Sequence, residues 1–429
     1  MVYPIWQELE DKIRSNRLFG FPVTWSDELI FPYYDGLSLA NVPQSVAAAL
    51  GAAFPDSNPL LDRVWQNRVP QAKRVVLFLM DGTGYQHLNK LMEDDQELYD
   101  AVLDLNGGRG IVPLTSVTPS TTVVALSSLW TGAPPAQTGM TGTLMFLREA
   151  SLLANMLAFA PIPGRHPQDV LAQWGLAPET IVKTKGLAQH LHEQGIPTYN
   201  VTNQAYIGTG LSRILHRGAE HAITHKSYGD FMGQVKAVLH ETKGKQSYVS
   251  IYWEAVDALA HKYGADHAYT NNEIREKIFA LRDLSFSSDF MDGETLFILL
   301  ADHGHADATN IIDLGHDELI SSSMQMSLSG DERHAYMYLR HGRMQAVKDR
   351  IDIQYADSLT YIESEKAIEG GYFGKNPVPE LYNRAGDLIL LPRSGYTLAD
   401  PVLGSLPIIS RHAGLSEQEM LIPFIWKLS

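Results

Sequence analysis

The sequence of 429 residues contains no cysteine. Without thiols it forms no disulfides, no thiolate zinc site, no iron–sulfur cluster and no cysteine nucleophile. Any metal would have to be held by histidine and carboxylate side chains. Basic residues are also in the minority, because 34 Lys and Arg stand against 49 Asp and Glu and give a formal net charge of −15. This charge argues against binding of nucleic-acid polymers or an anionic membrane by bulk electrostatics. It does not argue against a small anionic substrate, since a bound metal can dominate the local field.

Long apolar runs are missing as well. No stretch approaches the roughly 18–20 uninterrupted apolar residues of a membrane span. The first residues, MVYPIWQELEDKIRSNR, carry acids where a signal peptide needs a basic segment followed by an apolar one. We therefore expect no membrane span and a cytoplasmic location.

What the sequence does contain is an alternation of short apolar runs and longer helical stretches. The apolar runs lie at 74–82, 196–203, 246–257, 294–304 and 387–396. Continuous apolar strands separated by helices predict an α/β fold with a mostly parallel central sheet and helices on both faces. We expect residues 71–429 to form one domain. The Pro- and aromatic-rich residues 1–70 are expected to form a small N-terminal extension packed on its core.

Aspartates and histidines gather where these predicted strands end. Asp81 and Asp302 follow two of the runs, and His303 is adjacent to Asp302. Asp257 and His261 are four residues apart, so they share one face if that segment is helical. Ligands of open α/β sheets bind at the carboxyl ends of the strands. Together with His412, which precedes a glycine by two residues, these side chains are the N and O donors that suit zinc, manganese or iron.

Each of these residues also has an ordinary structural interpretation. An aspartate at a strand end is commonly a helix cap or a turn former. Several of the acids and histidines could instead form a solvated polar rim, namely His261, His303, His305, Asp307 and His316.

The segment 116–135 carries hydroxyl groups before a helical pattern. Pro119 is followed by Ser120, Thr121 and Thr122, and VVALSSLW then continues with helical spacing. A hydroxyl at this place lies at a helix N-terminus, where free N–H groups and the helix dipole favour an anion. An ordinary N-cap explains the same pattern. The spacing alone leaves the choice among the three hydroxyls open.

Taken in order, these motifs resemble those of the alkaline phosphatase superfamily. The set comprises a strand followed by Asp-Gly, then P-S-x-T with a later T-G, D-x-x-x-H, D-H-G and a late His-x-Gly. The sequence is most similar to the nucleotide pyrophosphatase/phosphodiesterase branch, also called type I phosphodiesterases, from about residue 70 to the C-terminus. In that branch the nucleophilic threonine lies nine residues before the threonine of the T-G pair. Counting back from Thr131 leads to Thr122.

The resemblance implies two divalent metal ions, most simply zinc, with manganese or iron as alternatives. It implies that Asp81, Asp302 and His303 hold one ion, with Thr122 coordinated on that side. The second ion is then held by Asp257, His261 and His412. Residues 71–429 would be an alkaline phosphatase-like catalytic domain.

The resemblance also implies a reaction. We expect a two-metal hydrolase of phosphoric esters, a phosphodiesterase or nucleotide pyrophosphatase that acts through a phospho-threonine intermediate on a small anionic ester. A phosphomonoesterase or a phosphonoacetate-type phosphonate hydrolase is the alternative within enzymes. Monoesterases need extra positive groups, and the absence of a basic cluster beside these motifs favours diesters. A non-catalytic, metal-stabilised binding protein is the alternative from another class.

One position departs from the family pattern. The family has an asparagine three residues after the nucleophile that helps to bind a phosphate oxygen, and this sequence has Ala125. Either another donor replaces it, with Asn203 or Thr141 as candidates, or the metals and the Val123 backbone N–H stabilise the oxyanion. Tyr85 and Tyr206 are candidates for stacking on a base or sugar, core packing being the simpler interpretation.

Overall fold

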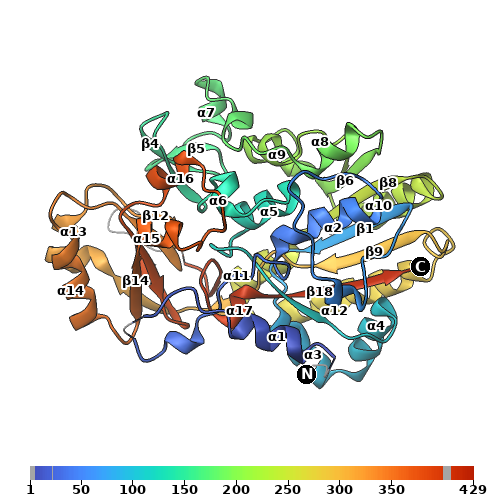
Figure 1. The fold of residues 1–429 in the computed structure, drawn as a ribbon, viewed down its shortest axis with the longest axis horizontal. Helices are drawn as coiled ribbons and strands as arrows, with labels where there is room; N and C mark the ends of the chain where they lie inside the picture. Colours follow the sequence, from blue (N-terminus) through green and yellow to red (C-terminus); the bar gives the residue numbers. More distant parts are fainter. Residues whose placement is uncertain (1–4, 22, 400–406) are drawn as a thin grey trace.

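The structure, a computed structural model, describes residues 5–21, 23–399 and 407–429. Its main element is a sheet of seven strands, which lies to the right in Figure 1. Their order is β2 (Val112–Thr115), β18 (Leu421–Leu428), β9 (Thr295–Leu300), β1 (Arg74–Met80), β8 (Ser247–Trp253), β6 (Thr198–Asn203) and β7 (His221–His225). Strand β18 pairs antiparallel with both of its neighbours, and the other pairs are parallel. The predicted mostly parallel sheet is therefore confirmed.

The register of the central strands brings their carboxyl ends to one edge. Met80, the last residue of β1, lies opposite Trp253, the last residue of β8, and Leu79 lies opposite Leu300 at the end of β9. All residues of β1 and β9 are buried. This burial explains the unbroken apolar runs in the sequence, because both faces of these strands are covered.

A second sheet of seven strands, all paired antiparallel, lies to the left in Figure 1. Its order is β14 (Leu359–Glu363), β15 (Leu388–Pro392), β13 (His334–Met337), β12 (Ser329–Asp331), β3 (Leu144–Leu147), β4 (Leu152–Asn155) and β5 (Ala160–Ile162). The apolar run at 387–396, expected in the parallel sheet, forms β15 here instead. A buried apolar run has the same sequence signature in either sheet, and the sequence does not show which strands it pairs with.

The N-terminal segment contacts both parts of the molecule. It contains α1 (Gln7–Arg14) and α2 (Val42–Ala49). The Trp6 indole is buried and donates to the Arg109 carbonyl at 2.8 Å. The Trp25 indole donates to the Ala356 carbonyl, before β14, at 2.8 Å. Buried side chains of both helices belong to the same apolar cluster as the central strands.

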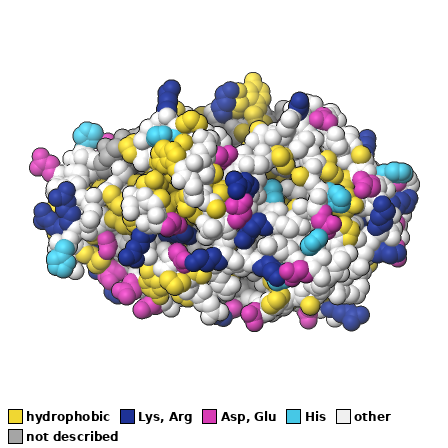
Figure 2. All heavy atoms as spheres, turned by 90° about the horizontal axis from the view of Figure 1, so that it is seen from above, with side chains coloured by type: hydrophobic (Ala, Val, Ile, Leu, Met, Phe, Trp, Pro, Cys, Tyr) yellow, Lys and Arg dark blue, Asp and Glu magenta, His cyan; other side chains and the backbone are white. Residues whose placement is uncertain are grey.

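Charged side chains of both signs are interspersed over the face shown in Figure 2, with apolar side chains between them. No helix among residues 5–21, 23–399 and 407–429 is long and apolar enough to cross a membrane.

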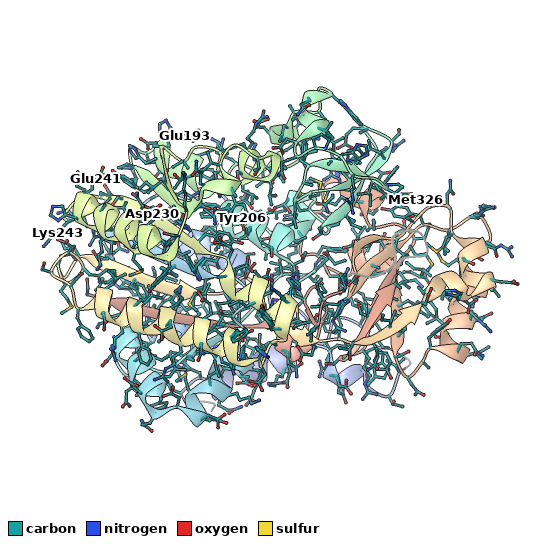
Figure 3. The ribbon with its side chains drawn as sticks, turned by 180° about the vertical axis from the view of Figure 1, so that it is seen from behind. Glu193, Tyr206, Asp230, Glu241, Lys243 and Met326 are labelled. Atoms are coloured by element: carbon teal, nitrogen blue, oxygen red, sulfur yellow. The ribbon has the colours of Figure 1, made fainter. Side chains whose placement is uncertain are left out.

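Helices cover both faces of the main sheet. On the face seen in Figure 3, α10 (Tyr228–Thr242) crosses in front, identified by the labels Asp230 and Glu241. Helix α12 (Ala268–Ser285) lies beside it, since the Lys277 ammonium lies 3.8 Å from the ring centroid of Tyr228. Further helices follow in the order α3 (Tyr85–Asp94), α4 (Gln96–Asn106), α5 (Thr122–Thr131), α8 (Leu187–His192), α9 (Gly210–Leu215) and α11 (Ala255–Tyr263). The carboxyl edge of β1, β8 and β9 meets the second sheet, and the candidate site lies there.

Candidate active site

The strand ends bring three carboxylates together. Asp81 follows β1 directly, Asp302 follows β9 by two residues, and Asp257 lies in the first turn of α11, which begins just after β8. The predicted helical spacing of Asp257 and His261 is thus present. The side chains of Asp81 and Asp302 are at most 2% exposed.

Asp81, Asp302 and His303 form the first group of possible metal ligands. The His303 Nε2 lies 3.4 Å from Asp81 Oδ1 and 3.3 Å from Asp302 Oδ2. The other oxygen of each carboxylate is engaged, because Asp302 Oδ1 accepts from the Gly82 and His303 N–H groups and Asp81 Oδ2 accepts from the Tyr252 hydroxyl. The two oxygens that face His303 are buried and have no hydrogen-bond partner among the described residues.

The second predicted group is Asp257, His261 and His412. The structure divides it between two groups of possible ligands, Asp257 with His261 and His305, and Asp257 with His303 and His412. Asp257 Oδ1 lies 3.3 Å from His261 Nε2 and 3.6 Å from His412 Nε2. The His261 Nδ1 lies 2.8 Å from the Ser410 carbonyl. Since a carbonyl can only accept, this contact puts the proton on Nδ1 and leaves the Nε2 lone pair directed at Asp257.

These separations fit a bound divalent ion. Ligands placed 2.0–2.1 Å from a tetrahedral zinc are about 3.3 Å from one another. The contacts of His261 and His412 with Asp257, and of His303 with Asp81 and Asp302, have this spacing. The His305 Nε2, at 2.8 Å from Asp257 Oδ1, instead lies at ordinary hydrogen-bond distance.

The electrostatics of the site also call for a cation. Burial and the neighbouring Asp302 and Asp257 carboxylates raise the pKa of Asp81 well above its usual range. Burial raises the pKa of Asp302 as well. Burial alone would raise the pKa of Asp257, but its contacts with His261 and His305 outweigh it and hold this pKa well below its usual range. Buried unpartnered carboxylate oxygens are unfavourable unless a positive charge neutralises them.

Burial favours the neutral, metal-binding form of His305 and His412, whereas contacts with Asp257 outweigh the burial of His261 and raise its pKa. Burial and the nearby His303 lower the pKa of His412 well below its usual range. Burial lowers the pKa of His305 to about 4. The His303 and His412 rings stack with their centroids 4.0 Å apart, which links the two groups of ligands.

The geometry separates the three hydroxyls that the sequence left open. The Ser120 hydroxyl donates to the Gly414 carbonyl at 2.8 Å. Thr121 is the N-cap residue of α5, makes no side-chain cap hydrogen bond and directs its hydroxyl to Asp331 Oδ1 at 3.4 Å. Thr122 is the first residue of α5, and its Oγ1 lies 3.1 Å from His303 Nε2. Of the three, Thr122 faces the carboxylate–histidine cluster.

Two loops hold the hydroxyl segment against the late histidine. Ser120 and Ala413 form an isolated antiparallel bridge, with the Ala413 N–H donating to the Ser120 carbonyl at 2.8 Å. The Gly414 N–H donates to Glu419 Oε1 at 2.9 Å, and Glu419 forms a buried ion pair with Arg333 from the second sheet. The second sheet therefore fixes the loop that carries His412.

Of the two groups predicted to bind a phosphate oxygen, the Val123 N–H is available at the N-terminus of α5 and the Asn203 side chain is engaged elsewhere. The first helical hydrogen bonds of α5 are donated by Val124 and Ala125 to the Thr121 carbonyl, which leaves the Val123 N–H outside the helical ladder. The Asn203 amide donates to Glu254 Oε1 at 2.6 Å and its carbonyl accepts from the Ala205 N–H, so the structure does not bring Asn203 into the cluster.

Ala125 and Thr141 are fully buried. Thr143, which the sequence did not single out, lies beside the N-terminus of α5 with its hydroxyl 3.5 Å from that of Thr121.

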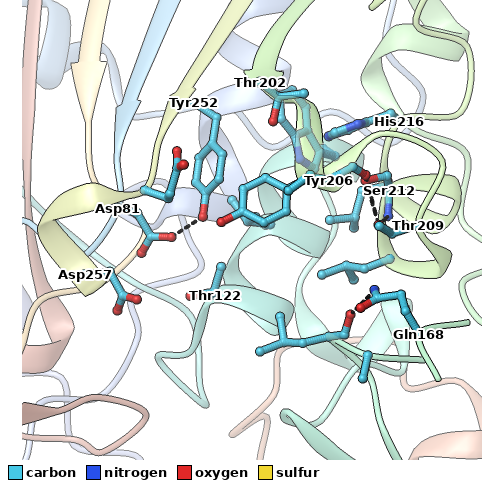
Figure 4. A pocket seen from close by; sticks show the side chains of 18 of the residues that line it. Asp81, Thr122, Gln168, Thr202, Tyr206, Thr209, Ser212, His216, Tyr252 and Asp257 are labelled. Atoms are coloured by element: carbon cyan, nitrogen blue, oxygen red, sulfur yellow. Dashed lines mark hydrogen bonds between the residues drawn. The ribbon is translucent and has the colours of Figure 1, made fainter. Parts of the chain in front are cut away.

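A pocket of about 520 Å³ opens beside the cluster. Asp81, Thr122 and Asp257 lie on one side of it in Figure 4, and His216 and Ser212 lie on the opposite side. Tyr206 and Tyr252 lie between them, with ring centroids 6.1 Å apart. Tyr85, by contrast, is fully buried with its hydroxyl 3.3 Å from Glu10, so it packs in the core.

Sequence reasoning missed two residues of the site as contributors. Tyr252 contacts Asp81, and His305 contacts Asp257. The position of His305 two residues after His303, in D-H-G-H, is the signal that could have identified it. His316, grouped with it in the polar-rim interpretation, is exposed and contacts Asp313.

The arrangement of sheet and site defines an alkaline phosphatase-like fold, and solved structures share it. A phosphonoacetate hydrolase from Sinorhizobium meliloti 1021 in complex with phosphonoformate matches with a TM-score of 0.59 and 17% identity over 83% of this chain and 90% of that chain. An inactive variant of murine ectonucleotide pyrophosphatase / phosphodiesterase 5 in complex with AMP matches with a TM-score of 0.59 and 14% identity over 82% of this chain and 87% of that chain.

The amino-acid sequence also matches the profile of a protein family. The profile described as type I phosphodiesterase / nucleotide pyrophosphatase matches residues 75–405. The chain therefore belongs to this family, within the alkaline phosphatase superfamily. A search of curated proteins gave no significant match.

Proposed function

We propose that the protein is a two-metal phosphodiesterase that uses Thr122 as its nucleophile. Membership of the family indicates a hydrolase of phosphoric esters. The observation that carries the finer proposal is the position of Thr122 Oγ1, 3.1 Å from the same His303 nitrogen that faces Asp81 and Asp302. A hydroxyl that only capped the helix or packed in the core would not have to lie beside these carboxylate and histidine side chains.

In this proposal Asp81, Asp302, His303 and Thr122 would hold one divalent ion, and Asp257, His261 and His412 the other. With only nitrogen and oxygen donors, zinc is the first choice and manganese or iron the alternatives. When bound, such ions lower the pKa of a coordinated hydroxyl and neutralise charge on the phosphoryl oxygens.

The chain's own groups then act in two displacements. Thr122 Oγ1 loses its proton to solvent and bonds to phosphorus, while the bond to the departing alcohol breaks and that alcohol takes up a proton. At the N-terminus of α5, the Val123 N–H donates to a phosphoryl oxygen. A water molecule then cleaves the phospho-threonine, releases a phosphate monoester and restores the Thr122 hydroxyl.

The charges around the pocket favour a diester over a monoester. Lys and Arg are absent from the pocket-lining residues of the described chain, whereas Asp81, Glu254 and Asp257 are among them. A monoester carries an additional negative charge, and phosphonoacetate carries a carboxylate. Neither would find a cationic side chain there. The substrate is a small ester, and a cytoplasmic location remains the prediction from the sequence.

The test compares bis-p-nitrophenyl phosphate, p-nitrophenyl phosphate and phosphonoacetate with zinc or manganese added. We expect the diester to be hydrolysed fastest. Faster turnover of the monoester or of the phosphonate would overturn the diester assignment. Thr122→Ala should lower kcat by at least about 1000-fold. Thr121→Ala, a matched hydroxyl deletion one residue away, should retain most activity.

A binding protein without catalysis is the alternative of another class. It predicts tight metal binding with no turnover of any of the three esters, and full retention of metal in Thr122→Ala. Hydrolysis that depends on Thr122 excludes it.

A further inference from the structure

The pocket extends away from the catalytic cluster along helix α5. Thr122, Leu126 and Trp130 all line it, and their spacing of four residues places them on one face of the helix. At 1.5 Å per residue, this face measures about 12 Å from the nucleophile to the indole. The helix that presents Thr122 therefore also forms the floor of the pocket.

The rest of the pocket wall consists largely of apolar side chains. Leu211 and Leu215 of α9 and Leu157, between β4 and β5, line the same pocket. The exposed fraction of Trp130 is 8% and that of Leu215 is 6%. An apolar group that enters here would exchange water for side chains on several sides.

Several polar groups of the wall are held by hydrogen bonds within the protein. Asn155 accepts from the Ala158 N–H at 2.9 Å, and Gln168 donates to the Leu157 carbonyl at 3.2 Å. The Thr209 hydroxyl donates to the Tyr206 carbonyl at 3.0 Å. These contacts fix the loops around the pocket, so the wall selects more by shape than by hydrogen bonds.

The far end of the pocket is uncharged. His216 lies 3.1 Å from the Asn200 amide, and its ring meets the Trp130 indole edge to face at 5.2 Å. Burial lowers the pKa of His216 to about 4, so it is neutral at physiological pH. Asp81 and Asp257 lie at the catalytic end of the pocket. Among the described residues that line it there is no Lys or Arg, so a second negative charge on a ligand would meet no positive side chain.

We propose that this pocket takes an uncharged, apolar substituent of the ester, an alkyl or aryl group that lies along α5 between Thr122 and Trp130. The inference rests on the proposed function for the position of the phosphoryl group. It assigns Leu126, Trp130 and Leu211 as specificity-determining residues. A nucleoside, whose base would stack on an aromatic ring such as Tyr206, is the competing ligand.

Binding of n-alkyl phosphonates to the zinc-loaded protein tests this assignment without requiring turnover. Calorimetry should show affinity rising by up to about fourfold per methylene from methyl to butyl. The increase should level off once the chain spans the roughly 12 Å to Trp130. Phosphonoacetate, with a carboxylate of similar size, should bind less tightly than propylphosphonate. Equal affinity of methyl- and octylphosphonate, or tighter binding of a nucleoside phosphonate than of octylphosphonate, would overturn the proposal.

Two variants locate the effect. Trp130→Ala should leave methylphosphonate affinity unchanged and move the plateau to longer chains. Leu211→Lys, at a partly exposed position, should weaken octylphosphonate and strengthen phosphonoacetate, each by about tenfold or more. Trp174→Ala removes an indole that is 62% exposed and does not line the pocket, so it should change neither ligand. If Leu211→Lys leaves both affinities unchanged, the assignment is wrong even where Trp130→Ala fails to fold.

Diester hydrolysis by the wild-type protein separates this inference from the proposed function. Chain-length-dependent binding without hydrolysis of any diester would remove the function and keep the pocket assignment. Hydrolysis of diesters with no chain-length dependence would remove the pocket assignment and keep the function.

Discussion

At the scale of single residues, the geometry of the site depends on which atom of each side chain faces the cluster of carboxylates and histidines. His303 shows this most clearly, because its Nε2 faces Asp81, Asp302 and Thr122 at 3.1–3.4 Å. The resemblance predicts a ligand set, but spacing alone could not choose among Ser120, Thr121 and Thr122. Only the partners of the three hydroxyls distinguish them, and those partners come from segments more than 180 residues away.

His305 gives the first prediction at this scale. Its hydrogen bond to Asp257 should hold that carboxylate in place for a metal, so His305→Ala should weaken metal binding by about 10- to 100-fold. Competition with a chromophoric chelator measures the affinity. His305→Gln retains an N–H donor and should recover part of the loss. His316→Ala, at an exposed histidine, is the control.

A complete loss of one ion in His305→Ala, not recovered by glutamine, would instead make His305 a direct ligand. Unchanged affinity in both variants would show that its contact with Asp257 has no role in metal binding.

Gly304 gives a second prediction, because the backbone of other segments lies very close to it. A Cβ atom at this position would lie 2.0 Å from the Gln418 carbonyl oxygen and 2.7 Å from the Gly84 Cα. Neither is the end of a flexible side chain, so Gly304→Ala should destabilise the protein by at least about 3 kcal/mol. Chemical denaturation measures the change.

Gly233→Ala is the matched control for this substitution. Gly233 lies inside α10, and a Cβ there would meet no atom of the described residues within 4 Å. The helix should become more stable by up to about 1 kcal/mol. Similar stabilities of the two variants would contradict the packing described at Gly304.

At the scale of elements, the carboxyl edge of the main sheet could be predicted and the second sheet could not. The runs before Asp81 and Asp302 are unbroken and apolar, so they indicate buried parallel strands. The strands of the second sheet are short and come from distant parts of the chain, as where β3 at Leu144 pairs with β12 at Gly330. Pairings of such long range are not visible in local periodicity.

Asp331 connects the second sheet to the nucleophile loop and gives a pH prediction. It lies at the end of β12, accepts from the Thr143 N–H at 3.1 Å and contacts Thr121. Burial raises its pKa from 3.8 to about 6. The folded state therefore holds this proton more tightly than the unfolded state, and the stabilisation is complete below the unfolded pKa and lost as the pH rises to the folded value.

Asp331→Asn should remove this dependence. The wild type should lose up to about 3 kcal/mol of stability from this group between pH 4 and 6, and the variant should show a correspondingly flatter profile. Urea denaturation at several pH values measures both. Parallel profiles of wild type and variant would show that Asp331 titrates normally.

At the scale of the whole molecule, the net charge of −15 is compatible with an anionic substrate because the acids have different roles. Many lie on the surface among basic residues (Figure 2). Three of them, Asp81, Asp257 and Asp302, converge in the site and belong to its groups of possible metal ligands. The net charge of the sequence does not show which acids lie on the surface and which lie in the site.

Removal of metal is expected to destabilise the entire fold, since the site joins strand ends, α5, α11 and the second sheet. With free zinc at 1,000 times the dissociation constant, each bound ion contributes about 4 kcal/mol. Thermal unfolding with chelator, and with two concentrations of zinc, should give Tm values that rise with free zinc. A Tm that is independent of chelator and zinc would contradict the fit of these residues to metal ions.

The central claim is that Thr122 bonds to phosphorus during hydrolysis of a diester. Acid-quenched reactions of the zinc-loaded enzyme with bis-p-nitrophenyl phosphate, followed by peptide mass spectrometry, test it most directly. The account predicts a nitrophenyl phosphate adduct on Thr122 that is absent from Thr122→Ala. Steady turnover with no adduct, or an adduct on Ser120 or Thr121, would contradict it.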